Sequence, residues 1–292
     1  MKKNKIKNKL FKSTIKIVGN KGLGKNFLGK AIKSYLVQNS KTNEIIVNGY
    51  RMLLDEDDVM QMSLFDYDPI ETKIVRTHVK KNYITVDIGS NIGYYTLLMA
   101  KQGAEVFSYE PEPKNFELLK KNITLNDFSL NVKLYNKAVS DFNGHSKLIL
   151  AARPEYGVGK HKLDSNRFGK ESIDVEVTKI ELDKIDFAKI DVEGTELHVL
   201  RGMKSLPNKI LIEFNAKNLK ESGSDYKDFF NFIEKYKIKQ ISKTGLDELD
   251  YDKLLNLNDL AANLFLYWSI KILILFSSII DLITKSYLWN NQ

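Results

Sequence analysis

The segment that most constrains the fold is Tyr83–Gly93, which reads YITVDIGSNIG. An apolar run ends in Asp87, and the chain then turns through Gly89 and Gly93 into a helix-like sequence. An open α/β sheet builds a nucleotide-binding crevice in this way, at the carboxyl ends of its strands. Glu110 ends the next apolar run. The sequence therefore predicts two carboxylates at adjacent strand ends.

The glycine spacing narrows the class of ligand. Asp87-x-Gly89-x-x-x-Gly93 differs from the G-x-G-x-x-G pattern of dinucleotide-binding folds, which disfavours a nicotinamide or flavin enzyme. Gly89 has no Cβ, so the backbone can turn tightly and approach a ligand there. A smaller, positively charged nucleotide suits two carboxylates better. S-adenosylmethionine meets this description, because it offers a sulfonium, an ammonium and a ribose diol to carboxylate acceptors.

Strands and helices alternate along the rest of the sequence. The expected strands are Ile84–Ile88, Glu105–Tyr109, Asn131–Tyr135 with Ala138 and Val139 as its exit, Phe187–Ile190, Ile210–Phe214, Ile238–Ser242 and Leu264–Tyr267. The expected helices are Tyr94–Lys101, Pro113–Asn122, Glu196–Met203 and Tyr226–Lys235. This order predicts an α/β fold with a mostly parallel sheet covered by helices on both faces.

Further elements are expected outside this alternation. Glu44–Leu54 alternates in polarity around an Asn-Gly pair, which predicts a hairpin. Pro69 is expected to open a helix before the first core strand. Lys147–Ala151 and Ile173–Thr178 are expected to pair and to flank the polar loop Arg153–Lys170.

The net charge of +8 is concentrated at the N-terminus. Residues 1–33 hold eleven of the 45 basic residues and no acidic one, so the other 34 basic residues are outnumbered by 37 acidic ones. A mildly acidic body does not suit a nucleic-acid-binding core. We expect three regions: a basic arm with a helix (1–43), an α/β domain (44–268) and an apolar helix (269–292).

The two terminal regions leave membrane association open. No apolar h-region follows the N-terminal lysines, so no signal peptide is expected and we predict a cytoplasmic protein. Leu264–Ile283 is a 20-residue run with Lys271 and Asp281 as its charges, which is long enough to span a bilayer. Because Leu264–Tyr267 is needed as the last strand, the rest of this run suits a membrane interface or a partner surface. The basic arm would add contact with anionic lipid.

Other functional classes find less support in the sequence. There is no cysteine, which excludes disulfides and thiolate metal sites. The four histidines lack metal-ligand spacing, so no metal site is predicted. Residues 19–26 nearly match the phosphate loop G-x-x-x-x-G-K-[ST], but Asn26 replaces the hydroxyl that would hold magnesium. A phosphate-loop nucleotidase remains an alternative.

Five segments, taken in order, resemble a known family. They read VDIGSNIGYYT, YEPEPKNFELLKKN, NKAVSD followed by Gly144, KIDVEGTELHVLRGM, and IEFN. Together they resemble the FkbM family of S-adenosylmethionine-dependent methyltransferases, from about Gly49 to Tyr267. The resemblance implies a Rossmann-like class I methyltransferase domain with a seven-stranded sheet whose last strand is antiparallel. It also implies O-methylation, often of sugars or polyketides.

Cofactor-binding roles follow for residues in these motifs. The residues expected around the methionine part of S-adenosylmethionine are Asp87, Gly89, Ser90, Asn91 and Gly93. Glu110 is expected to accept hydrogen bonds from both ribose hydroxyls, because a carboxylate takes two donors at once. Ala138 and Val139 are expected to flank the adenine.

The segment KIDVEGTE supplies the candidates for catalysis. Asp191 and Glu193 follow a buried strand, and crowded carboxylates raise one another's pKa. Either one could then act as general base on a substrate hydroxyl at neutral pH. Helix capping is the competing interpretation for Glu196. Glu213, at the end of the next strand, would face the same crevice.

The polar loop Arg153–Lys170 is expected to bind the methyl acceptor, as loops between strands often bind substrates. His161 in this loop is a candidate for assisting proton transfer. Lys160 and Lys162 flank it and would favour an anionic acceptor.

The sequence thus predicts an O-methyltransferase that uses S-adenosylmethionine and acts on a hydroxyl of a saccharide or glycolipid. Its partner would be a small-molecule or glycan acceptor. The alternative is a non-enzymatic, membrane-peripheral binding protein that keeps this fold. Methylation of nucleic acid is disfavoured, because the body is not basic and no motif for holding a base is present.

Overall fold

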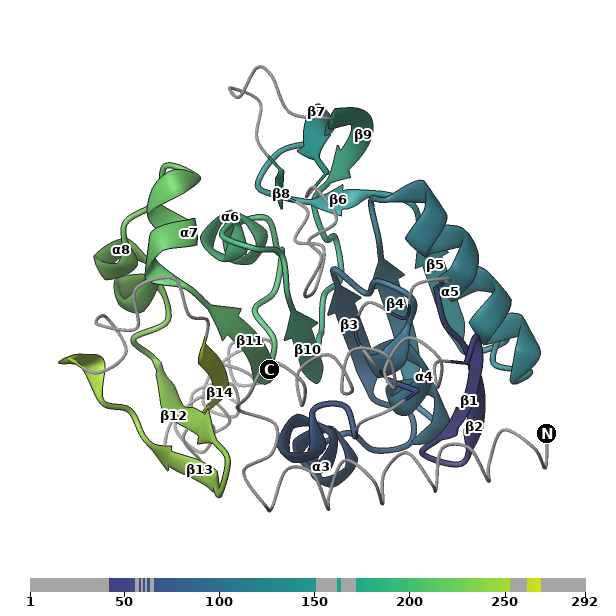
Figure 1. The fold of residues 1–292 in the computed structure, drawn as a ribbon. Coiled ribbons are helices and arrows are strands. Elements are labelled where there is room, and N and C mark those ends of the chain that lie inside the picture. Colours follow the sequence, from purple (N-terminus) through teal and green to yellow (C-terminus); the bar gives the residue numbers. More distant parts are fainter. Residues whose placement is uncertain are drawn as a thin grey trace, which may run out of the picture.

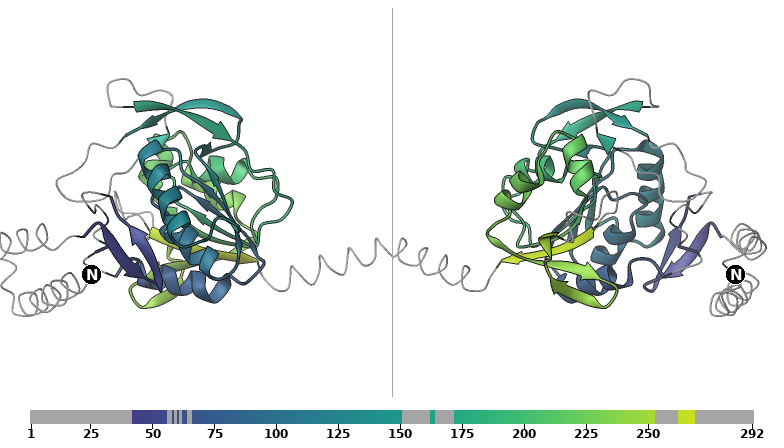
Figure 2. Two further views of the ribbon diagram at one scale, coloured as in Figure 1. Left: turned by 90° about the vertical axis from the view of Figure 1, so that its right-hand side faces the viewer. Right: turned by 60° about the vertical axis from the view of Figure 1, so that its left-hand side comes forward.

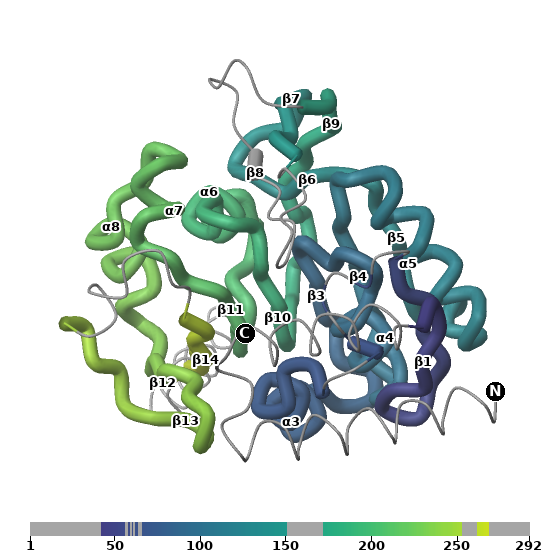
Figure 3. The backbone as a smooth tube through the Cα atoms, in the orientation of Figure 1, coloured from purple at the N-terminus to yellow at the C-terminus, as the bar shows by residue number. Residues whose placement is uncertain are grey.

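Eight strands form the large sheet of the computed structural model, in the order β13-β12-β14-β11-β10-β3-β4-β5. The structure describes residues 42–55, 58, 60, 62–63, 66–150, 162–163, 172–252 and 262–268. The strands of this sheet are β3 (Ile84–Ile88), β4 (Glu105–Tyr109), β5 (Val132–Tyr135), β10 (Phe187–Ile190), β11 (Lys209–Phe214), β12 (Tyr236–Ser242), β13 (Gly245–Glu248) and β14 (Ala262–Trp268). Figure 3 shows how strands that are distant in sequence, such as β3 and β10, run side by side.

The sheet is mostly parallel, as predicted. The central strands β5, β4, β3, β10 and β11 pair in parallel, whereas β14 is antiparallel to both β11 and β12. The expected antiparallel last strand is therefore confirmed. The expected number of seven strands is wrong, because the chain reverses after Ser242 and Gly245–Glu248 adds an eighth strand to β12.

Helices cover both faces of the large sheet (Figure 1). On one face lie α3 (Pro69–His78), α4 (Tyr94–Lys101) and α5 (Pro113–Leu125). On the other lie α6 (Glu196–Arg201), α7 (Ala216–Glu221) and α8 (Tyr226–Phe232). Each face has its own apolar core, because side chains alternate between the two faces along every strand. In β3, for example, Val86 and Ile88 both pack in the core beside α6–α8, so Thr85 and Asp87 lie on the α3–α5 face.

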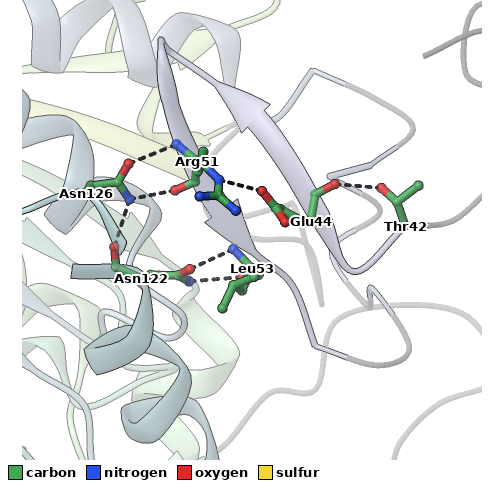
Figure 4. A network of polar contacts seen from close by, with 6 residues as sticks. All are labelled: Thr42, Glu44, Arg51, Leu53, Asn122 and Asn126. Atoms are coloured by element: carbon green, nitrogen blue, oxygen red, sulfur yellow. Dashed lines mark hydrogen bonds and ion pairs between the residues drawn. The ribbon is translucent and has the colours of Figure 1, made fainter. Parts of the chain in front are cut away.

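The predicted N-terminal hairpin is present as β1 (Glu44–Val47) and β2 (Tyr50–Leu53). Two asparagines of α5 fasten it to the domain (Figure 4). Asn122 Nδ2 donates to the Leu53 carbonyl and its Oδ1 accepts from the Leu53 N–H, at 3.0 and 2.7 Å. Asn126 makes the same pair of bonds with the backbone of Arg51, at 2.7 and 2.9 Å. Both amides thus continue the hydrogen bonding of a strand edge.

A second, four-stranded sheet has the order β6-β9-β7-β8. Its strands are β6 (Ala138–Val139), β7 (Gly144–Ile149), β8 (Lys162–Leu163) and β9 (Ser172–Thr178). The predicted pairing of the two segments around the polar loop is confirmed, since β7 and β9 are antiparallel. Ala138 and Val139 do not extend the third strand of the large sheet. They leave it and pair with β9. The small sheet, in teal, lies at the top of both views in Figure 2.

Several expectations fall outside the described residues. These are the basic arm and its helix, the phosphate-loop-like segment, His161 with most of its polar loop, and the apolar C-terminal helix. The membrane-peripheral alternative rests on these terminal segments. Within the part of the chain that the structure describes, no helix combines the length and apolar character needed to cross a membrane.

Candidate active site

A cavity of about 360 Å³ opens at the carboxyl ends of the central strands. Its wall takes residues from the ends of β3, β4, β10 and β11, from β6 and β14, and from the segment before α3. Cavities that bind small ligands have this size and this position in α/β folds. The predicted edge of the sheet therefore carries a hollow large enough for a nucleotide.

Gly89 is required by the packing of two strand ends. Its φ is 76°, and a Cβ at this position would lie 1.9 Å from the Asp191 carbonyl oxygen. Gly89 lines the cavity, so the missing side chain also leaves the ligand side open. Gly93 has a φ of 96° and would place a Cβ 2.5 Å from Leu119 Cδ1. Gly93 is not among the residues that line the cavity. Its role in the described structure is to let α4 start close to α5.

The loop between these glycines is tied to the end of β4. Ser90 donates from both its N–H and its Oγ to the Tyr109 carbonyl, at 3.1 and 3.2 Å. The Asn91 N–H donates to Glu110 Oε2 at 2.7 Å, with Asn91 at a φ of 50°. Ser90, Asn91 and Glu110 all line the cavity. The two motifs predicted to share a ligand are thus joined directly.

Glu110 is a buried carboxyl whose two oxygens can each accept a further hydrogen bond. Its Oε1 accepts from the Glu112 N–H at 2.9 Å and its Oε2 from Asn91, while 4% of the residue is exposed. Each oxygen keeps a second lone pair for another donor. Burial raises the pKa of Glu110 to about 7, although the two backbone N–H groups favour the ionised form.

Asp87 accepts a hydrogen bond from the Thr96 hydroxyl, which is bonded in turn to the hydroxyl of Ser108. Thr96 Oγ1 donates to Asp87 Oδ2 at 2.5 Å. Because Thr96 has a single hydroxyl proton, Ser108 must be the donor in the 2.9 Å contact between Ser108 Oγ and Thr96 Oγ1. Burial raises the pKa of Asp87 to about 6, against the effects of Thr96 and of the ammonium of Lys189.

The predicted adenine-flanking residues also belong to the cavity. Ala138 and Val139 form β6, are buried, and line the same hollow as Glu110. Tyr109 lines it too, and its ring stacks on Tyr135 with centroids 4.6 Å apart. Ala138, Val139 and Tyr109 thus form an apolar wall, and the polar residues Asn115 and Lys137 also line the cavity.

Lys189 was missed by the sequence prediction. It pairs in register with Asp87 across β10 and β3, so the two side chains share one face of the sheet. Lys189 is 3% exposed, and its ammonium lies 3.0 Å from Asp191 Oδ2 and 5.3 Å from the centroid of the Tyr95 ring. Burial alone would lower the pKa of Lys189, but Asp191, Glu213 and Asp87 outweigh it and raise the pKa. A lysine inside a short buried strand is a signal that could have revealed this ion pair, because buried lysines are nearly always paired.

Three carboxylates gather beside this lysine. Oxygens of Asp191, Glu193 and Glu213 lie within 4.8 Å of one another, close enough to share one cation. Glu193 has a φ of 55°, and its Oε2 accepts from Asn218 Nδ2 at 3.1 Å. The structure thus brings together both predicted base candidates and Glu213, and it places Lys189 as the cation among them.

Glu196 stands apart from this group. It does not line the cavity, and its Oε1 accepts from the Gly194 N–H at 2.8 Å. Its Oε2 is buried and has no hydrogen-bond partner among the described residues. Burial raises the pKa of Glu196 to about 8, so the neutral acid predominates at pH 7. Glu196 is therefore a buried residue at the start of α6, and its neutral form lacks the charge on which the capping interpretation depends.

The segment before α3 supplies a wall that was not predicted as part of the site. Tyr67 and Asp68 line the cavity, together with Tyr95 of α4. The Tyr95 hydroxyl donates to Asp68 Oδ2 at 2.9 Å. Asn263 of β14 completes this side and donates to Glu71 Oε1 at 3.0 Å. These residues come from separate segments, so no local pattern shows that they meet.

Comparisons with known proteins identify the family of this chain. The family model described as the methyltransferase FkbM domain matches residues 87–239, more than half of the 292 residues. The methyltransferase sdnD of Sordaria araneosa is 29% identical over 43% of this chain and 62% of its own length. The hexuronic acid methyltransferase AglP of Haloferax volcanii is 27% identical over 60% of this chain and 72% of its own. The chain thus spans less than two thirds of the first of these relatives. Among solved structures, a SAM-dependent O-methyltransferase of Thermotoga maritima superposes with a TM-score of 0.42 at 11% identity, covering 77% of each chain.

Proposed function

The chain belongs to the FkbM methyltransferase family, and we propose that it transfers a methyl group from S-adenosylmethionine to a hydroxyl of a saccharide or glycolipid. The resemblance carried by the five sequence segments is confirmed by the family match. The dependence on S-adenosylmethionine and the nature of the acceptor belong to the proposal.

The observation that carries the proposal is the single cavity that joins Glu110 to Asp191. It runs from the end of β4, past Gly89, to the ends of β10 and β11. Its volume of about 360 Å³ is in the range that encloses a nucleotide-sized ligand. One continuous hollow lets a bound cofactor and an acceptor meet near the middle.

The residues at the β4 end fit the cofactor. Glu110 offers a free lone pair on each oxygen, which suits the two hydroxyls of a ribose. Ala138 and Val139 offer an apolar wall for a purine. Asp87, oriented by Thr96, offers negative charge to an ammonium or to a sulfonium. When bound, S-adenosylmethionine supplies a methyl group on a sulfonium, and the electron pair of the broken carbon–sulfur bond stays on sulfur.

The residues at the β10 end fit the acceptor. The acceptor oxygen would form the new carbon–oxygen bond, and its proton would pass to the carboxylate of Asp191. Lys189 holds Asp191 Oδ2 at 3.0 Å, so Asp191 Oδ1 is the oxygen left to face the hydroxyl. Glu193 is the second candidate for this proton, with Oε2 engaged by Asn218. The Haloferax relative is named for a hexuronic acid, which supports a saccharide acceptor.

The proposal is tested by following product formation. The purified chain is incubated with S-adenosylmethionine and a mixture of free glycosides and extracted glycolipids. Release of S-adenosylhomocysteine together with a 14-dalton gain in one acceptor supports the function. A folded protein that binds the cofactor but methylates no hydroxyl compound in that mixture contradicts O-methylation of saccharides.

A further inference from the structure

Helix α6 connects the cavity wall to the chain that follows β6. Thr195, which lines the cavity, directly precedes the helix. His198 and Gly202 lie four residues apart at its other end, so they face the same side of the helix. The residues that they meet on this side are Ser140 and Asp141, which directly follow β6.

Gly202 allows a close backbone contact with the first of these residues. A Cβ at position 202 would lie 1.9 Å from the Ser140 carbonyl oxygen. The Ser140 N–H donates to the Thr178 carbonyl at 3.1 Å, where β9 ends. The backbone of Ser140 is therefore packed between the end of α6 and the small sheet.

His198 adds a side-chain bridge to this contact. Its Nδ1 lies 3.1 Å from Asp141 Oδ2, and its Nε2 lies 3.3 Å from Ser224 Oγ. Because an ionised carboxylate accepts hydrogen bonds and donates none, Nδ1 is the donor to Asp141. In the neutral ring Nε2 then accepts from the Ser224 hydroxyl. We call these two contacts the His198 bridge.

The bond to Asp141 is the stronger half of the His198 bridge. Partial burial would raise the pKa of Asp141, but the hydrogen bond from His198 helps to lower it below its ordinary value. Asp141 is therefore ionised at neutral pH. Hydrogen bonds to an ionised group are stronger than those between neutral groups.

The order serine, histidine, aspartate is also that of a nucleophilic triad. However, Ser224 is 7% exposed and does not line the active-site cavity. Its hydroxyl is thus poorly accessible to a substrate. The burial of Ser224 favours a bridge that holds segments together over a second reactive centre.

The His198 bridge bears on the cavity through β6. Ala138 and Val139 form this strand, line the cavity and provide the apolar wall proposed for adenine. Within the described sheets β6 pairs with β9 alone, so few backbone bonds hold it in place. Asp141 follows Val139 by two residues and does not line the cavity. Holding Asp141 therefore restrains β6 from outside the ligand site.

We propose that His198 is a positioning residue for the cofactor, because its bond to Asp141 keeps the β6 wall where adenine requires it. This inference rests on the proposed function and adds to it a residue that lies outside the cavity lining. Any effect of His198 on cofactor affinity would thus act through Asp141 and β6.

The test measures binding of S-adenosylhomocysteine to the full chain by calorimetry, at a temperature where each variant is folded. His198→Leu removes both ring nitrogens and keeps an apolar side chain, and Asp141→Ala removes the acceptor. Each should raise the dissociation constant by about 5-fold or more, because loss of a hydrogen bond to a charged group has effects on this scale. The double variant should bind about as well as the weaker single variant, because both changes break the same contact.

Two further variants separate positioning from a general loss of stability. Asp141→Asn keeps an oxygen that can accept from Nδ1, so its affinity should stay within about 2-fold of the wild type. His145→Leu is the matched control, because His145 is an exposed histidine of β7 in the same small sheet and does not line the cavity. This control should leave the affinity unchanged.

The outcomes distinguish this inference from the function beneath it. Unchanged affinity in folded His198→Leu and Asp141→Ala overturns the inference and leaves methyl transfer standing. A loss in Asp141→Asn as large as that in Asp141→Ala, or an equal loss in His145→Leu, also overturns it. If His198→Leu does not fold, Asp141→Ala decides the test, since the Asp141 side chain is 35% exposed. A folded wild-type chain that binds neither S-adenosylmethionine nor S-adenosylhomocysteine overturns the proposed function, and the inference with it.

Discussion

Gly89 and the carbonyl oxygen of Asp191 approach so closely that a methyl group at position 89 would lie 1.9 Å from that oxygen. The contact joins the ends of β3 and β10, where Asp87 and Asp191 lie. The Asp191 N–H also donates to the Ile88 carbonyl at 2.9 Å, so the two strand ends are fixed as one unit. Backbone contacts therefore fix the relative positions of the two strand ends at the proposed active site.

Gly89→Ala should destabilise the fold by about 3 kcal/mol or more, because it adds a backbone clash to an unfavourable φ. Chemical denaturation measures the loss. Gly223→Ala is the matched control: its φ is +85°, close to the +76° of Gly89, but beyond its chain neighbours no atom of the described residues lies within 4 Å of the added Cβ. The control should lose about 1 kcal/mol. Equal losses in the two variants would show that the contact with Asp191 is unimportant.

Lys189→Met should lower the free energy of unfolding by about 3 kcal/mol, since it leaves the carboxylates around a buried ion pair uncompensated. Adding Asp191→Asn to this variant should restore part of the loss. Lys204→Met removes an exposed ion pair with Asp183, whose side chains are 53% and 85% exposed, and should change stability by at most about 1 kcal/mol. If Lys189→Met is as mild as Lys204→Met, the ion pair does not stabilise the site.

Cofactor binding should strengthen as pH rises from 6.5 to 8.5. The pKa of Glu110 is raised to about 7, and the ionised form is the better acceptor for ribose hydroxyls, so protonation competes with binding below pH 7. For this group alone the dissociation constant should be about 4-fold larger at pH 6.5 than at pH 8.5. Calorimetry in buffers of different ionisation heat would detect the proton released on binding.

The amine of the ligand titrates in the same range, so a control variant is needed. Glu110→Gln keeps the shape of the side chain and removes its titration. It should bind more weakly and release fewer protons at pH 7 than the wild type. The same proton release in both proteins would rule out Glu110 as the titrating ligand contact.

Asp191→Asn should reduce turnover by about 10²-fold or more while leaving the affinity for S-adenosylmethionine within a few fold, if Asp191 takes the proton of the acceptor hydroxyl. The assay is single-turnover methyl transfer to whichever glycoside the wild type accepts. Glu193→Gln distinguishes the two base candidates, because the variant with the larger loss marks the base. Full activity in both variants excludes either carboxylate as the base.

The sequence predicted most of the large sheet, because its central strands are short apolar runs that end in an acid or a glycine. Ile84–Ile88 and Glu105–Tyr109 match β3 and β4 to the residue. The eighth strand, Gly245–Glu248, was missed because its side chains are mostly exposed and carry no apolar periodicity. The exit of Ala138 and Val139 into a second sheet was missed because two residues cannot show which strand they will join.

The sequence predicted the residues at the β4 end of the cavity better than those near the end of β10. Residues at the β4 end lie in local motifs of glycine and acid, and all of them except Gly93 line the cavity. Near the end of β10, Tyr67, Asp68 and Tyr95 meet in the cavity wall through the packing of α3 and α4 against the strand ends. Such meetings depend on long-range packing, which a single sequence does not display.

The most direct test of the account is a calorimetric titration of the folded wild-type chain with S-adenosylmethionine and with S-adenosylhomocysteine. The account predicts one site per chain with a dissociation constant in the micromolar range, weakened about 10-fold or more by Glu110→Ala. No heat and no thermal stabilisation with either ligand, in a protein that melts cooperatively, would contradict it.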